Sequence, residues 1–144
     1  MFRLKTEPWG VEFFRRYPAD DAKTQVPGRE FLDAIPHKVA ARMVAVLEAV
    51  AEAPPPSYSG GGYWEAMHNM AGFYEVRVDS QRTHYRLFCL LERDGKKVGL
   101  EGPSVVVITG KKKRFRTLLS PSDYAEVRAL GEEFRRRSPR KVQR

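Results

Sequence analysis

Apolar residues recur along this chain at two different spacings, which divide it into helical and extended parts. Residues 11–17 are rich in apolar and aromatic side chains and predict a first strand or an extended arm, and residues 29–35 predict a short helix. From residue 36 onward, apolar side chains recur every three or four positions, which predicts a longer helix with one buried face. This stripe consists of Val39, Met43, Val46, Leu47 and Val50. The proline run at residues 54–56 ends the helix, because proline lacks an N–H and clashes with the preceding turn.

The second half of the chain carries short apolar runs of the kind that form strands. Strands are predicted at residues 63–70, 73–79 and 83–92. A charged, glycine-rich loop follows at residues 93–103, and the β-branched run at residues 104–109 is typical of a central strand. Because short connections join these strands, we expect them to form a mostly antiparallel sheet.

A last helix is predicted to begin at Ser120-Pro121-Ser122-Asp123, which combines a hydroxyl N-cap, an early proline and an acidic first turn. Its predicted buried face consists of Tyr124, Val127, Leu130 and Phe134. The sequence therefore predicts an α+β fold, with N-terminal helices on one face of the sheet and a C-terminal helix. We expect one domain over residues 1–134, followed by a basic tail at residues 135–144 that is frayed.

The predicted hairpin at residues 73–92 separates two kinds of side chain. A two-residue turn at Ser80-Gln81 would place Arg77 opposite His84 and Glu75 opposite Arg86. Since side chains alternate between the faces of a sheet, these four residues share one face with two phenylalanines, Phe73 and Phe88. The opposite face is suited to packing against helices. It carries Tyr74, Val76, Val78, Tyr85 and Leu87.

The charged face of this hairpin has two interpretations. Two arginines on a rigid hairpin can clamp a phosphate, and their charge persists at any biological pH. Alternatively, Glu75 and Arg86 form a cross-strand ion pair on a solvated surface, where such pairs contribute only about 0–1 kcal/mol. The first interpretation requires Arg77 and Arg86 to lie on the same side of the hairpin and outside a salt-bridged interior.

Positive charge is concentrated in the second half of the chain. Of 26 Lys and Arg residues and 18 Asp and Glu residues, eight of each lie in residues 1–60, so residues 61–144 hold 18 basic and 10 acidic residues. Such an excess is typical of proteins that bind nucleic acid. A basic run follows the predicted central strand: Lys111, Lys112, Lys113, Arg114, Phe115 and Arg116. It is either a solvated loop or an RNA-binding site in which Phe115 stacks on a base.

The composition also argues against several classes of protein. The single cysteine, Cys89, allows no internal disulfide and no multi-cysteine metal site, and its apolar neighbours indicate a buried structural thiol. The three histidines, His37, His68 and His84, show no metal-ligand spacing, so we expect a reaction that needs no metal and no cofactor. No stretch approaches the roughly 20 apolar residues of a membrane span, and the N-terminus lacks the apolar segment of a signal peptide. We therefore expect a cytoplasmic protein.

The order of these motifs resembles the RelE/ParE toxin superfamily, and within it the HigB and phage-derived Gp49-like branch. The resemblance begins with Pro-Gly-Arg-Glu-Phe-Leu at residues 27–32 and a helix. It continues with Gly-Phe-Tyr-Glu-Val-Arg at 72–77 and His-Tyr-Arg-Leu-Phe at 84–88, then a Val/Ile strand and Lys-Lys. It ends with Ser-Pro and a final helix, so it extends from about residue 9 to residue 134.

This resemblance implies an endonuclease that cleaves mRNA on the ribosome and is held inactive by an antitoxin encoded beside it. In that chemistry a ribose 2′-hydroxyl attacks the adjacent phosphate. Arg77 and Arg86 match the basic motif positions of the family, and Lys112 and Lys113 match its Lys-Lys pair. The resemblance assigns the arginines to the phosphate and its transition-state charge, where preorganised electrostatics contribute most.

One departure from the family pattern concerns the strand before Tyr-Glu-Val-Arg. The family often carries Lys-x-Leu there, whereas residues 64–69 of this chain contain no lysine. His68 is the candidate to replace it as a general acid or base, a role worth roughly 10²–10⁴-fold in rate. Two other functions remain open at this point: a ParE-type inhibitor of DNA gyrase, and a phage-derived module that binds nucleic acid without cleaving it.

Overall fold

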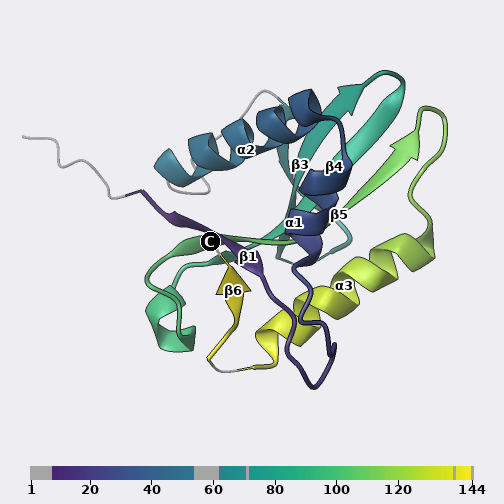
Figure 1. Ribbon diagram of the computed structural model, residues 1–144. Coiled ribbons are helices and arrows are strands. Elements are labelled where there is room, and N and C mark those ends of the chain that lie inside the picture. The colour runs from purple at the N-terminus through teal and green to yellow at the C-terminus, as the bar shows by residue number, and fades with distance from the viewer. Residues whose placement is uncertain (1–7, 54–61, 71, 138, 144) are drawn as a thin grey trace, which may run out of the picture.

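The computed structural model describes residues 8–53, 62–70, 72–137 and 139–143. Its centre is a six-stranded sheet with the strand order β2-β3-β4-β5-β1-β6, in which β1 and β5 are parallel and the other neighbours are antiparallel (Figure 1). The strands are β1 (Gly10–Phe14), β2 (Trp64–Ala66), β3 (Phe73–Ser80), β4 (Thr83–Glu92), β5 (Ser104–Arg114) and β6 (Val142–Gln143). The predicted α+β fold with a mostly antiparallel sheet is confirmed.

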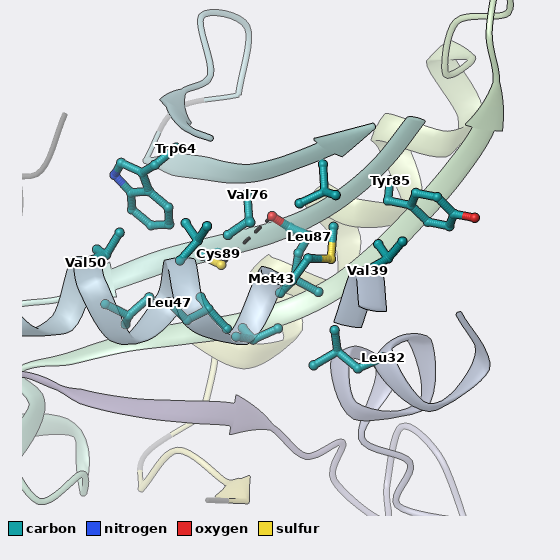
Figure 2. Packing of buried hydrophobic residues seen from close by; sticks show 14 of the residues in the cluster. Leu32, Val39, Met43, Leu47, Val50, Trp64, Val76, Tyr85, Leu87 and Cys89 are labelled. Carbon is teal, nitrogen blue, oxygen red and sulfur yellow. Dashed lines mark hydrogen bonds between the residues drawn. The ribbon is translucent and has the colours of Figure 1, made fainter. Parts of the chain in front are cut away.

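Two N-terminal helices, α1 (Pro27–Ala34) and α2 (His37–Glu52), cover one face of the sheet (Figure 1). The predicted stripe of α2 is buried, and it packs against the apolar face of the β3–β4 hairpin (Figure 2). Cys89 lies in this layer with no exposed surface, and burial raises the pKa of its thiol well above the usual range, as expected for a structural cysteine. The proline run predicted to end α2 lies outside the described residues, and α2 ends at Glu52.

The C-terminal helix α3 (Pro121–Arg135) packs on the other face of the sheet (Figure 1). The predicted cap is present, because the Ser120 hydroxyl accepts from the Asp123 N–H and the Asp123 carboxylate accepts from the Ser120 N–H. Beneath α3 lies a second apolar cluster that includes Phe73 and Phe88. The face predicted to carry charge is therefore half apolar, and α3 buries the apolar half.

The hairpin of β3 and β4 turns one residue later than predicted. Gln81 and Arg82 form the two-residue turn, with φ angles of 49° and 60°, which are the positive values that a type I′ turn requires. Arg77 therefore lies opposite Arg86, not opposite His84. The predicted register is wrong by two positions, but an even shift keeps every side chain on its predicted face.

Strand β5 is longer than the sequence indicated. It continues to Arg114 and stays paired with β4, so most of the basic run belongs to a strand and not to a loop. By contrast, β2 is shorter than the predicted strand at residues 63–70 and holds only three residues. The loop between β4 and β5 contains a short 3₁₀ helix, Gly95–Val98. No helix in the described ranges is long and apolar enough to cross a membrane.

The sequence predicted a frayed basic tail, but the tail returns to the sheet. Strand β6 pairs antiparallel with β1, and the Arg140 guanidinium forms an ion pair with Glu92 at 2.5 Å. Arg140 also lies over the Phe134 ring at 5.1 Å. An acidic residue on a distant segment, Glu92, holds the tail in place. The basic sequence of the tail does not by itself reveal this partner.

Candidate active site

Two adjoining cavities open on the face of the sheet that carries the charged side chains. The larger has a volume of about 480 Å³ and lies between the β2–β3 turn and α3. The smaller, about 240 Å³, is bordered by His84 on the hairpin and by residues 117–119. Glu75, Arg77 and Tyr124 line both cavities and form the boundary between them. We call the two cavities together the groove.

The two arginines project from the same face of neighbouring strands, directly opposite each other. The Arg77 side chain is 42% exposed and its Nε lies 3.5 Å from Oε1 of Glu75. The Arg86 side chain is only 12% exposed, and its Nη1 donates to Asp79 Oδ1 at 2.9 Å and to the Tyr85 carbonyl. Since the Asp79 side chain is 48% exposed, this ion pair borders solvent and is not a salt-bridged interior. Arg77 is thus the more accessible guanidinium, and Arg86 is a charge fixed beneath the groove.

The Glu75 carboxyl group holds its proton more tightly than an ordinary glutamate. Burial raises the pKa of Glu75, the nearby Arg86 and Arg77 lower it less, and Glu65 on the neighbouring strand raises it again. The Glu75 side chain is 16% exposed. A carboxyl group whose pKa is moved toward neutrality, in contact with a cavity, is suited to exchange a proton with a bound substrate.

A second proton-transfer group lies at the far end of the hairpin. The Nδ1 atom of His84 lies 2.8 Å from Oδ1 of Asp79. Burial opposes ionisation of Asp79, but hydrogen bonds from His84 and Arg86 outweigh it and lower the pKa of Asp79. Because an ionised carboxylate only accepts hydrogen bonds, Nδ1 carries the proton and Nε2 is left for proton transfer. The His84 ring also stacks on Phe115, with 4.5 Å between ring centroids.

The basic run does not form one surface. Lys111 pairs with Arg86 and Lys113 with His84 across the strands, so both lie on the face of the groove, whereas Lys112 lies beside Tyr85 on the helix face. The basic run was predicted to form one RNA-binding site, but alternation along β5 distributes its side chains over both faces of the sheet. Arg114, which alternates to the helix face, and Arg116, which lies beyond the strand, are both exposed.

Acidic residues of α3 hold both lysines of the groove face. The Nζ of Lys111 lies 2.6 Å from Glu126, and that of Lys113 lies 3.6 Å from Asp123. These ion pairs tie the end of β5 to the first turns of α3. Lys113, held in this way, lines the smaller cavity.

His68 lies in the β2–β3 turn and not on a strand, and it is exposed in the wall of the larger cavity. The structure thus brings Glu75, Arg77, Arg86 and His84 around the smaller cavity and places His68 in the adjoining one. Two residues of this site were missed by the sequence reasoning. One is Asp79, which alternation places on the same face as Arg77 because it lies two residues further along the strand. Tyr124 was assigned to the buried face of α3, and it does contact Phe88 edge-on while lining the groove.

The arrangement combines an accessible guanidinium, a second guanidinium that is fixed and largely covered, a carboxyl group of raised pKa and an oriented imidazole. These groups can hold a phosphodiester, move protons on either side of it and stabilise added negative charge. Within the described residues, no three His, Cys, Asp or Glu side chains lie where they could hold a metal ion.

Comparison with known proteins identifies the family. The chain matches no curated protein and no solved structure. The model of the family described as phage-derived protein Gp49-like (DUF891) matches residues 30–129, which is more than half of the 144 residues and spans every strand of the groove. The chain therefore belongs to the Gp49-like family, which is part of the HigB/RelE-type toxin group.

Proposed function

We propose that this protein is the toxin of a type II toxin–antitoxin pair and that it cleaves mRNA on the ribosome. The observation that carries the proposal is the pair Arg77 and Arg86, directly opposite each other on a rigid hairpin. They lie beside a carboxyl group of raised pKa, Glu75, and the oriented imidazole of His84. Membership of a toxin family supports the same conclusion.

In the proposed reaction the ribose 2′-oxygen attacks the neighbouring phosphorus, and the bond from phosphorus to the 5′-oxygen breaks. The 2′-hydroxyl proton passes to the Glu75 carboxylate, and the protonated His84 imidazole gives a proton to the leaving 5′-oxygen. The products are a 2′,3′-cyclic phosphate and a 5′-hydroxyl. Arg77 holds the phosphate oxygens, and Arg86 adds fixed positive charge beneath them, which favours the transition state.

RNA outside the reacting nucleotides is held by the basic residues around the groove. Phe115, stacked on His84 and 40% exposed, offers an aromatic surface to a neighbouring base. Lys111 and Lys113 on the groove face, and Arg116 just beyond β5, supply charge for the RNA backbone, whereas Lys112 and Arg114 alternate to the helix face. The partners that follow from the proposal are mRNA, ribosomal RNA and a cognate antitoxin protein.

The test is controlled induction of the protein in bacteria, followed by mapping of mRNA 5′ ends. The wild type is expected to arrest growth and to produce new 5′-hydroxyl ends within reading frames. Arg77→Ala is expected to relieve both effects while the protein remains folded. Arg136→Ala, which removes an arginine paired with Asp20 away from the groove, is the matched control and is expected to remain toxic.

Three results would contradict the proposal. If bacteria that produce the wild type grow normally and their transcripts stay intact, the protein is not an mRNA-cleaving toxin. Growth arrest with DNA damage and intact transcripts favours gyrase inhibition instead. Salt-dependent RNA binding without cleavage on translating ribosomes favours a binding module that has lost catalysis.

A further inference from the structure

The larger cavity of the groove contains more recognition chemistry than the proposed cleavage reaction uses. It lies on the β2 side of Arg77, so it adjoins the proposed position of the scissile phosphate. Its volume of about 480 Å³ falls in the range of roughly 300–1,000 Å³ that is typical of small-molecule sites. The ring of Tyr124 and the side chains of Met67 and Met70 supply apolar wall. A cavity of this size and lining suits a flat, aromatic group.

The polar groups of this cavity include two carboxylates and an arginine from α3, next to Arg77, His68 and Asn69. Glu65 lies directly opposite Glu75 on neighbouring antiparallel strands, and both side chains line the cavity. Arg128 reaches the same cavity from α3. Neither Glu65 nor Arg128 forms an ion pair with another residue in the described part of the chain. Both therefore have hydrogen-bonding capacity to offer a ligand.

A single-stranded RNA base is read by stacking on aromatic rings and by hydrogen bonds to its edges. A carboxylate accepts two hydrogen bonds best when two N–H donors lie side by side. Among the four RNA bases only guanine offers this pair, at N1–H and N2–H. In adenine and cytosine an acceptor lies beside the amino group, and in uracil two carbonyl oxygens flank the single N–H. Guanine also presents O6 and N7 as acceptors, the pair that arginine contacts with two hydrogen bonds.

We propose that this cavity binds a guanine base next to the scissile phosphate, with Glu65 accepting from its N1–H and N2–H and Arg128 donating to its O6 and N7. Tyr124 provides the ring against which the base packs. Glu65 is then a specificity-determining residue, because it touches the substrate without taking part in proton transfer. This inference rests on the proposed function, because it assumes that RNA lies in the groove.

The test measures binding of short RNA oligonucleotides that carry a 2′-deoxy sugar at the cleavage position, so that attack is impossible. A uridine background carries G, A, C or U in turn on each side of that position, and fluorescence anisotropy gives the dissociation constants. For one of the two positions, wild type is expected to bind the G oligonucleotide about 5- to 150-fold more tightly than the A oligonucleotide, the usual range for a two-bond base contact. Inosine, which lacks the N2 amino group, is expected to lose part of this preference.

Two variants separate specificity from folding and from charge. Glu65→Gln is expected to fold normally, because Glu65 is exposed on a short strand at the edge of the sheet, and to reduce the preference for G to less than about threefold. The control is Glu132→Gln, which removes an exposed acid on α3 outside the cavity and makes the same change in net charge as Glu65→Gln. It is expected to retain the preference for G.

The outcomes distinguish this inference from the function on which it rests. Equal binding of all four bases by the wild type overturns the guanine site and leaves the nuclease proposal intact. An unchanged preference for G in folded Glu65→Gln overturns the role of Glu65. Failure of the wild type to bind any of these oligonucleotides overturns the guanine site, whereas the nuclease proposal stands or falls with the mRNA ends mapped after induction.

Discussion

The two faces of the β3–β4 hairpin are built from the same two strands and have opposite properties. Val76, Val78, Tyr85 and Leu87 point toward α1 and α2 and are buried almost completely. The residues between them point toward α3 and remain partly open to solvent, because α3 covers only the apolar half of that face. The helix face stabilises the fold, whereas the groove face carries groups that are costly to bury and that can act on a substrate.

Strict alternation makes this division possible. A residue that is suitable for catalysis can lie directly between two residues of the core, so the groove inherits the rigidity of the hairpin. Glu75 shows the cost of the arrangement, since burial raises its pKa, and at neutral pH its ionised form is less favourable in the folded protein than in the unfolded chain. This comparison predicts that substitutions on the two faces change different properties.

The largest effect is expected from Glu75→Gln on the groove face. Removal of the proton acceptor is expected to lower the cleavage rate by about 10²–10⁴-fold, which corresponds to about 3–5 kcal/mol. In the wild type, cleavage is expected to increase as pH rises through a pKa above that of an ordinary glutamate, and this dependence is expected to disappear in the variant. Rates on translating ribosomes across a pH series provide the measurement.

The same variant also tests the stability argument. A raised carboxyl pKa favours folding at low pH, and this contribution is lost as pH rises through the pKa of the folded state. Because a glutamine side chain resembles the protonated form of glutamate, Glu75→Gln is expected to be at least as stable as the wild type at neutral pH. Clear destabilisation in urea unfolding would contradict this.

The helix face is expected to respond in the opposite way. Leu87→Ala is expected to lower the free energy of unfolding by about 2–5 kcal/mol, because Leu87 is completely buried and leaves a cavity beneath α2. Leu118→Ala is the matched control, since Leu118 is 89% exposed, and it is expected to change stability by less than about 0.5 kcal/mol. Urea unfolding measures both, and equal effects would remove the contrast between a core face and an open one.

A smaller effect is expected at the start of α3, beside the groove. Ser120→Ala removes the side-chain cap on the Asp123 N–H and is expected to cost about 0.5–2 kcal/mol. Ser122→Ala, two residues later, keeps that cap and is the control. Unfolding curves that coincide for the two variants would show that the cap does not fix where α3 begins.

Sequence pattern predicted the parts of this molecule that depend on local periodicity. The limits of β4, the apolar stripe of α2 and the cap at Ser120 follow from alternation, helical spacing and capping chemistry. The placement of Arg77 and Arg86 on one face was also predicted correctly, even though the turn was assigned to the wrong residues. A type I′ turn usually contains asparagine or glycine, so the residues Gln81-Arg82 do not indicate one.

The features that the sequence did not reveal depend on distant contacts. Phe73 and Phe88 lie on the charged face by alternation, but only α3, much further along the chain, determines that they are buried. Likewise, β5 remains a strand through its lysines because β4 pairs with it and α3 supplies acidic partners. The return of the tail depends on Glu92, which is far from it in sequence.

Purified protein, translating ribosomes and a defined mRNA show directly whether Arg77 and Arg86 support mRNA cleavage. Cleavage is expected to leave a 2′,3′-cyclic phosphate and a 5′-hydroxyl, to stop when the cut nucleotide carries a 2′-deoxy sugar, and to fall about 10²–10³-fold in Arg77→Ala. Intact mRNA with the wild type, or equal cleavage by a folded Arg77→Ala protein, would contradict this expectation.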